Sequence, residues 1–436
     1  MALGVVGIVA GFLNAPKTIE DVEKLLADSH HNEASHSEKV SHDAHAAHAV
    51  EATHAEAKVV DSVKVEAVDS THAVAEAVDS SAVAVAETHS DNHDSHKKDE
   101  VAHSDDEHQK HLEHVLHQLQ NKPWSALYVA CIFFMLISVG VLAFYAIQYA
   151  AQAGWSPILF RVMESITGYL LPGSIIFFIL LVAASMHWGH NHIFVWMNPD
   201  VINPKHADYD KLIDLKSGYL NVPFFLGRAA VFLIVWNLYR YFSRKNSLAQ
   251  DAASDNSNYK KNFKLAAGFL VFFIVSESMM SWDWIMSVDP HWYSTLFGWY
   301  VFASFFVSGI TVIAMTTLYL KSKGYLEQVN TSHIHDLAKF MFGISIFWTY
   351  LWFSQFMLIW YSNIPEEVTY FVTRIEHYRL PFFGMLALNF IFPLLILINT
   401  DFKRLTWIVV MAGTVILFGH YIDFFNMIMP ATVGDQ

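Results

Sequence analysis

Several ionisable residues stand inside apolar stretches of the sequence, where a charge is expensive. Glu277 and Asp283 follow the run FKLAAGFLVFFIVS, and Arg228, His420 and Asp423 interrupt other apolar runs. Burying one charge at the centre of a membrane costs at least about 2.5 kcal/mol, so each such residue is a functional candidate. Carboxylates and imidazoles in a dry site are groups that exchange and relay protons. The pattern therefore indicates proton chemistry inside a membrane.

Further candidates stand at the ends of the apolar stretches. His187 closes one stretch, and Asp289 and His291 lie in the turn VDPHWYS. At about 1.5 Å per helical residue, these three and the five residues above fall in the half of the membrane away from the most basic loops. On the basic side, the candidates for proton entry are Asp336 and Lys339.

Each candidate also has a purely structural interpretation. Arg228 and Glu277 could form an ion pair between neighbouring helices, since an opposite charge lowers the cost of burial. Asp289 and His291 could cap and turn an exposed loop, and His187 could be a hydrogen-bonded core residue. The one-sided distribution favours a functional site, because polar residues tolerated at random would not prefer one leaflet.

The elements that must position these residues are membrane helices. Of 436 residues, 54% are hydrophobic and 16% are charged, which is too apolar for a soluble chain of this length. We expect an all-α integral membrane protein with eight transmembrane helices. Pro393, inside the seventh, predicts a kink. The expected spans are 126–150, 169–189, 222–242, 263–287, 294–320, 337–361, 382–399 and 404–428.

The N-terminal quarter has a different composition. Residues 1–122 carry 23 Asp and Glu against 9 Lys and Arg, a net charge of −14, while the remainder carries 18 of each. Residues 1–16 predict either part of a membrane helix whose true start lies upstream or a short interfacial helix. Thr18 and Asp21 predict a capped helix within 17–29. Residues 30–121 lack large apolar side chains, so we expect an acidic, partly helical or disordered tether.

The tether is rich in histidine. Sixteen of the 25 histidines precede residue 118, and four recur at every third position: His108, His111, His114 and His117. On a helix this spacing makes a partial histidine stripe that could hold a transition metal weakly. A solvated linker is the alternative.

Loop charges and the cysteine content limit the topology and the cofactors. Lys and Arg gather in alternate loops, so the positive-inside rule places the tether and the tail 431–436 in the periplasm. With Cys131 as the single cysteine, the chain forms no internal disulfide and holds no cluster on four thiolates. Because no CxxCH motif is present, we expect no covalently bound cofactor.

The segment SWDWIMSVDPHWYSTLFGWYVFAS and the opening GFLNAPKTIEDVEKLL resemble one family. They are similar to ActF, the NrfD-like membrane subunits of the bacterial alternative complex III. The resemblance covers residues 1–28 and roughly 122–436. It implies two four-helix bundles, over 122–290 and 291–430, joined by the VDPHWY turn.

The resemblance also implies a role and partners. It implies a subunit of a respiratory quinol:cytochrome c, or quinol:acceptor, oxidoreductase in the bacterial inner membrane. The implied partners are a sister NrfD-like subunit (ActC), an iron–sulfur subunit, haem c subunits, further subunits, a terminal oxidase in a supercomplex and membrane lipid, but no nucleic acid. Haem c and iron–sulfur clusters would lie in partner subunits only, while quinol, such as menaquinol, and lipids are the ligands implied for this chain.

The resemblance leaves the local chemistry open. His187, Arg228, Glu277 and Asp283 fall in the first bundle, in a place similar to the quinol site of the sister subunit. They could bind quinol, relay protons or do neither in a non-catalytic scaffold. A secondary transporter is a weaker alternative, because the two halves lack interrupted helices at matching positions.

Overall fold

The computed structural model describes residues 10–25 and 95–434, and the side chains of 95–108, 110, 111 and 114 lie outside that description. Contacts divide the chain into two units, residues 1–17 with 115–436 and residues 18–114.

In the described part of the second unit, the Thr18 hydroxyl accepts from the Asp21 amide, and the Asp21 carboxylate accepts from the Thr18 amide. The predicted capping of this short helix is therefore confirmed. All regular structure in the described ranges is helical.

Eight helical segments of the described chain are long and apolar enough to cross a membrane, which confirms the all-α membrane fold. They are Val115–Ala150, Pro157–Ser185, Val222–Asp251, Ser257–Val288, Phe297–Ser322, Thr331–Ser362, Arg379–Leu397 and Thr406–Val433.

Two of the eight predicted spans differ most from the structure in where they start. The first long helix begins at Ser95, inside the expected tether, and continues through Pro123 to Ala150. The second span begins at Pro157 rather than 169, because three short helical segments precede the main helix. The second span therefore includes Arg161 and Glu164, which lie outside the predicted span that starts at 169.

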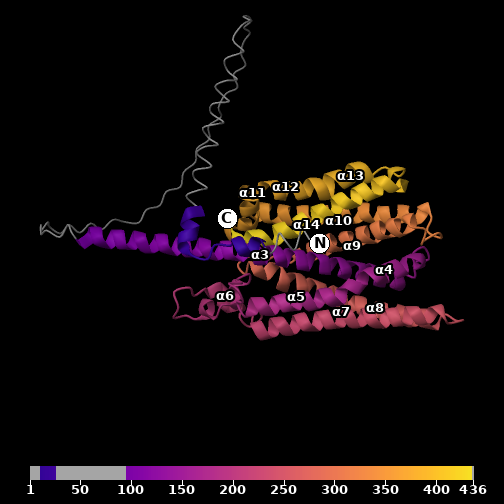
Figure 1. The fold of residues 1–436 in the computed structure, drawn as a ribbon, viewed down its shortest axis with the longest axis horizontal. Helices are drawn as coiled ribbons and strands as arrows, with labels where there is room; N and C mark the ends of the chain where they lie inside the picture. The colour runs from indigo at the N-terminus through magenta and orange to yellow at the C-terminus, as the bar shows by residue number, and fades with distance from the viewer. Residues whose placement is uncertain (1–9, 26–94, 435–436) are drawn as a thin grey trace, which may run out of the picture. The chain divides into compact units, whose positions relative to one another are not determined.

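The elements are labelled as in Figure 1. The long helices and the segments of the two interrupted spans are α3 (Ser95–Ala150), η1 (Pro157–Leu159), α4 (Phe160–Ile166), η2 (Thr167–Tyr169), α5 (Leu170–Ser185), α7 (Val222–Asp251), α8 (Ser257–Trp284), α9 (Phe297–Ser322), α10 (Thr331–Ser362), α12 (Arg379–Leu386), η6 (Ala387–Ile391), α13 (Phe392–Leu397) and α14 (Thr406–Val433). Short elements in the connections are η3 (Val195–Met197), η4 (Pro199–Ile202), α6 (Lys211–Lys216), η5 (Met286–Val288), α11 (Pro365–Glu376) and η7 (Phe402–Arg404).

Within the larger unit, α7 packs on α5 and α8, while α9 packs on α10 and α14 (Figure 1). We call the helix ends next to loops 252–256, 323–330 and 398–405 the lysine-rich end. The opposite end carries the connections 186–221, 285–296 and 363–378. The predicted periplasmic side corresponds to this opposite end.

Two glycines let α3 and α9 cross closely. A methyl group on Gly309 would lie 2.8 Å from the Val141 amide nitrogen, and one on Gly140 would lie 2.5 Å from the Phe305 carbonyl oxygen. Small residues allow such backbone contact in membrane helices, where van der Waals packing provides much of the association energy. This crossing joins α9 directly to the first long helix.

The seventh span is interrupted before Pro393. Its middle segment, η6, is a π-helix, and α13 begins one residue before the proline. Proline removes the amide that would bond to the carbonyl four residues earlier, here Asn389, and its ring clashes with that carbonyl. The wider π turn relieves the clash, so the structure has a π-bulge before Pro393, the residue at which a kink is predicted.

Candidate functional site

The first buried polar group is an ion pair between α7 and α8. Arg228 Nε lies 2.7 Å from Asp283 Oδ2, and Arg228 Nη2 lies 3.0 Å from Asp283 Oδ1. The two residues are 7% and 0% exposed. A bidentate arginine–carboxylate pair is the strongest geometry for such an interaction.

The third guanidinium nitrogen of Arg228 and the faces of the group also have partners. Its Nη1 donates to the Tyr219 carbonyl at 3.2 Å, and the group lies 3.9 Å and 4.1 Å from the ring centroids of Tyr219 and Phe224. The Ser287 hydroxyl donates to the carbonyl oxygen of Asp283. Both charges are therefore compensated, as expected of a pair that holds two helices together.

Glu277 does not belong to this pair. Its carboxylate accepts from the hydroxyls of Ser278 and Ser281, each at 3.3 Å. Glu277 and Asp283 are six residues apart on α8, which places them about 120° apart around the helix. The proposed pair of Arg228 with Glu277 is therefore wrong, since Arg228 bonds to Asp283 instead.

Glu277 instead faces a cavity of about 260 Å³ next to α9. The cavity wall is otherwise apolar and consists of Ile147, Leu270, Phe273, Ile274, Trp299 and Phe302. Among the described residues, Glu277 has no ion-pair partner, although the residue is buried. It is therefore a carboxylate in an apolar wall without a compensating cation.

A second buried cluster lies around Asp423 on α14. The Asp423 carboxylate accepts from the Tyr300 hydroxyl, from the Ser304 hydroxyl at 2.8 Å and from the Trp348 indole at 2.9 Å. These donors come from α9 and α10, and Asp423 is fully buried. All three donors are neutral, so the second cluster differs in kind from the first.

His420 stands one turn before Asp423 and completes the cluster. Its Nδ1 lies 2.9 Å from the Ser304 hydroxyl and 3.5 Å from Asp423 Oδ2. Its Nε2 is buried and has no hydrogen-bond partner among the described residues. The imidazole therefore has one nitrogen within the cluster and one still available for a proton or a water molecule.

The π-bulge brings a further polar side chain to this region. Asn389 lies against Gly419, the residue before His420, and both polar atoms of its side chain are buried and unpartnered in the described chain. Buried polar groups usually bond to protein or to ordered water. Asn389 and His420 Nε2 are therefore suitable positions for internal water.

Towards the opposite end, Tyr300 lines a small cavity with both polar and apolar residues in its wall. The cavity has a volume of about 10 Å³, near the minimum for one water, and its wall includes Tyr300, Tyr370 and Arg374. Buried Arg374 donates to the carbonyls of Asn426 at 2.8 Å and Tyr370 at 2.7 Å. Tyr300 therefore stands between the Asp423 carboxylate and a space that can hold water.

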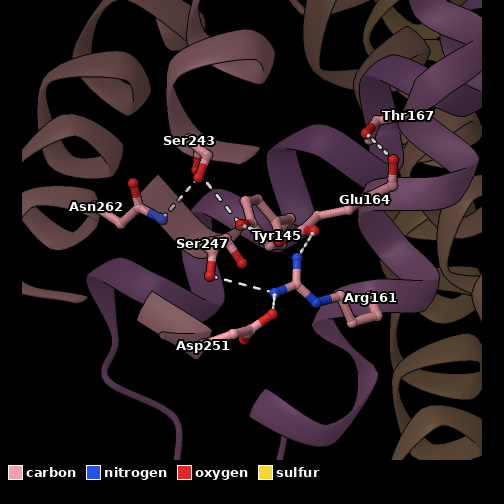
Figure 2. Close-up of polar contacts among 8 residues, drawn as sticks. All are labelled: Tyr145, Arg161, Glu164, Thr167, Ser243, Ser247, Asp251 and Asn262. Atoms are coloured by element: carbon pink, nitrogen blue, oxygen red, sulfur yellow. Dashed lines mark hydrogen bonds and ion pairs between the residues drawn. The ribbon is translucent and has the colours of Figure 1, made fainter. Parts of the chain in front are cut away.

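A third polar cluster lies at the lysine-rich end (Figure 2). Buried Glu164 accepts from the Tyr145 hydroxyl at 2.9 Å and pairs with Arg161 at 2.6 Å. Arg161 also pairs with Asp251 and donates to the Ser247 carbonyl at 3.2 Å. The sequence pattern indicated only Asp336 and Lys339 on this side and missed Arg161 and Glu164, because the predicted second span starts after them.

The predicted entry residues Asp336 and Lys339 are present at this same end as a pair. Lys339 Nζ lies 2.8 Å from Asp336 Oδ1, one turn apart on α10. Both side chains are partly exposed, so the pair contributes little to stability.

A group of histidines lies at the opposite end, in the connection after α5 and on the neighbouring part of α3. The rings of His117 and His192, and those of His187 and His192, lie 5.2 Å apart. Burial lowers the pKa of His192 to about 4, and the neighbouring histidines, including His190, add to the effect. His187 therefore belongs to a histidine cluster in this loop and does not join Arg228 and Asp283.

Asp289 and His291 lie in the connection between α8 and α9. His291 Nε2 is 2.5 Å from Asp210, the residue that caps α6, and Lys216 donates to the Pro290 carbonyl at 2.5 Å. Partial burial alone would raise the pKa of Asp210, but hydrogen bonds from His291 and from backbone amides outweigh it and hold that pKa below its usual value. These contacts give His291 a role in fastening the loop.

No group of metal-binding side chains with suitable geometry occurs in the described ranges. Of the proposed histidine stripe, the side chains of His108, His111 and His114 lie outside the described residues. His117, the fourth member, contacts the ring of His192.

Sequence reasoning missed several members of these clusters. Tyr300 and Ser304 are four residues apart, and His420 and Asp423 are three apart, so each pair shares one helix face. This spacing is visible in the sequence. The sequence does not show that the pair on α9 contacts the pair on α14. Arg374 lies in the connection between two spans, where the sequence pattern did not single it out, and α11 buries it.

The predicted sites thus separate into three groups. Arg228 and Asp283 form an ion pair, Glu277 stands alone in an apolar wall, and Asp423 and His420 form a cluster with neutral hydrogen-bond donors. Searches with protein-family models and against curated proteins find no match for this chain.

Proposed function

We propose that this chain is a proton-handling membrane subunit of a respiratory quinol:acceptor oxidoreductase. The respiratory assignment is supported by the resemblance of SWDWIMSVDPHWYS and the N-terminal segment to the ActF family. The proton role is carried by one observation: Asp423 and His420 form a fully buried acid–base couple among neutral donors.

The couple can bind one proton. Asp423 has no Lys or Arg partner among the described residues, so ionised Asp423 with neutral His420 carries one negative charge. Adding one proton to either residue makes the couple neutral overall. An uncompensated charge is costly at this depth, and one added proton removes it.

The geometry of the couple connects it to proton donors and acceptors on two sides, at His420 Nε2 and at the Tyr300 hydroxyl. His420 can accept a proton at the free Nε2 while Nδ1 releases one to the Ser304 hydroxyl, because imidazole holds protons on either nitrogen. Ser304 donates to Asp423, and the Tyr300 hydroxyl connects Asp423 to the small cavity beside Arg374. Hydroxyl groups donate and accept at once, so they carry protons without becoming charged.

An Asp423→Asn substitution in the complete complex tests this function. Proton movement into vesicles during turnover should fall at least about tenfold, because a positioned acid–base group contributes roughly 100-fold or more to proton transfer. Asp401→Asn, in an exposed loop, is the matched control and should leave proton movement unchanged. Normal proton movement from an assembled Asp423→Asn complex would refute the proposal.

A scaffold role is the second candidate. It is favoured by the Arg228–Asp283 pair, which is compensated on both sides and needs no exchange of protons. Copurification tests the respiratory assignment separately from proton conduction. A purified chain with no haem or iron–sulfur partner would contradict the respiratory assignment. The Asp423→Asn result concerns proton conduction alone.

A further inference from the structure

A cavity of about 380 Å³ lies at the lysine-rich end, beside the first turns of α10. Its wall consists of Trp155, Asp336, Lys339, Phe340, Gly343 and Ile344. Trp155, in the connection after α3, stacks on Phe340 with ring centroids 6.0 Å apart. The proton path proposed above uses none of the apolar residues of this wall.

The cavity is amphipathic along the axis of α10. Asp336 and Lys339 lie nearest the start of the helix at Thr331, while Gly343 and Ile344 lie one turn and more further into the span. At 1.5 Å per residue, Lys339 and Ile344 are about 7.5 Å apart along the helix. A tryptophan at such a polar–apolar boundary is typical of the membrane interface.

The wall itself holds one cation and one carboxylate, and two further cations lie near it. Besides Lys339, the adjoining η7 carries Lys403 and Arg404, and Lys403 Nζ lies 5.0 Å from the ring centroid of Phe342. Burial lowers the pKa of Lys403, and the Lys339 ammonium adds to the effect, so the two cations interact. Asp336 offsets one of these charges and pairs directly with Lys339.

The wall remains accessible from the side of the membrane. Phe340 and Gly343 are exposed on the surface of α10, and a methyl group on Gly343 would meet no other atom within 4 Å. A long chain lying along this helix would therefore contact Phe340, Gly343 and Ile344 without displacing protein atoms. Such a groove below a basic rim fits an amphiphile that carries a negative head.

We propose that this cavity binds an anionic phospholipid from the leaflet at the lysine-rich end. Lys339 would hold the phosphate, Lys403 and Arg404 would supply attractive charge, and one acyl chain would lie along Phe340, Gly343 and Ile344. Basic pockets between membrane helices recognise anionic headgroups in this way. A zwitterionic lipid would satisfy Asp336 as well, but its ammonium would meet the excess positive charge.

Two substitutions with matched controls test the site. Lys339→Gln removes the phosphate contact, and Lys264→Gln removes an exposed lysine at the same end of α8. Gly343→Phe fills the groove, while Gly268→Phe adds the same bulk at an exposed glycine of α8 that also has open space around it. The purified complex is titrated with phosphatidylglycerol or phosphatidylcholine of identical chains, and retained lipids are counted by native mass spectrometry.

The unmodified complex should retain phosphatidylglycerol roughly tenfold more tightly than phosphatidylcholine, because both lipids carry a phosphate but only the choline ammonium would meet the excess positive charge near the rim. Lys339→Gln should reduce that preference to about twofold or less, and Gly343→Phe should remove one retained phosphatidylglycerol; both controls should behave like the unmodified complex. Equal retention of the two lipids in the unmodified complex would overturn the proposal. A phosphatidylcholine molecule displaced by Gly343→Phe would indicate a zwitterionic lipid instead and would equally overturn it.

Discussion

The buried carboxylates Asp283 and Asp423 solve the same physical problem in different ways. Asp283 is neutralised by the Arg228 guanidinium, whose other donor and faces are also occupied. Asp423 receives only neutral donors and shares its environment with a histidine. Both residues are fully buried, so burial alone does not distinguish them.

The difference lies in what a proton would change. Adding a proton to Asp283 would leave a buried arginine without a counter-charge, which is strongly unfavourable. Adding a proton to the Asp423–His420 couple removes a net charge from an apolar region. A fixed pair therefore favours structure, whereas an uncompensated carboxylate beside a histidine favours exchange.

The largest effect should come from Asp283→Asn. This change leaves Arg228 buried and unpaired, so we expect a loss of about 3–5 kcal/mol in the free energy of unfolding. Asp423→Asn strands no cation, and we expect a loss of about 1–3 kcal/mol. Reversible unfolding in mixed micelles measures both.

A double variant provides the control for this comparison. Arg228→Met combined with Asp283→Leu removes both charges and should recover most of the stability lost in Asp283→Asn. If Asp283→Asn and Asp423→Asn cost the same, the distinction between a compensated and an uncompensated carboxylate is wrong.

The crossing of α3 and α9 should be the next most sensitive point. Gly309→Leu places side-chain atoms where the Val141 backbone lies, and we expect a cost of about 1–3 kcal/mol in unfolding free energy from overpacking. Gly268→Leu, at an open position, should cost far less. Equal melting temperatures for the two variants would show that the helices can separate without penalty.

Tyr300→Phe should separate proton transfer from stability in the second cluster. It removes the hydroxyl that connects Asp423 to the small cavity, and we expect proton transfer to slow about tenfold, equivalent to about 1.4 kcal/mol in the barrier. Tyr128→Phe removes another buried hydroxyl, which donates to the Trp284 carbonyl, and should leave proton transfer unchanged. Equal rates in both variants would exclude Tyr300 from the path.

At neutral pH the smallest effect should appear in the histidine loop at the opposite end. His192 has a folded pKa of about 4 against an ordinary 6.5, so the unfolded chain binds more protons between these values. Stability should therefore be greatest above pH 6.5 and decline as the pH falls towards 4. His192→Asn should flatten this part of the pH–stability curve; a curve with unchanged slope would contradict the assignment.

The sequence predicts contacts between residues that are close along the chain better than contacts between residues that are far apart. His420 and Asp423 lie on one face of one helix, and their polar character within an apolar run was visible directly. Tyr300, Ser304 and Trp348 looked like ordinary residues of apolar spans, because their role depends on contact with a third helix. Glu164 was missed for a simpler reason, since the span that contains it was started too late.

The sequence by itself determined the eight apolar spans, the irregularity before Pro393 and the positions of the costly charges, because each follows from hydrophobicity or backbone chemistry within one segment. The tertiary structure decided which charges meet. Arg228 pairs with Asp283 and not with Glu277 because six residues rotate the α8 surface by about 120° relative to α7. Helix rotation and the helix-crossing geometry depend on packing between segments distant in sequence, so no local pattern encodes them.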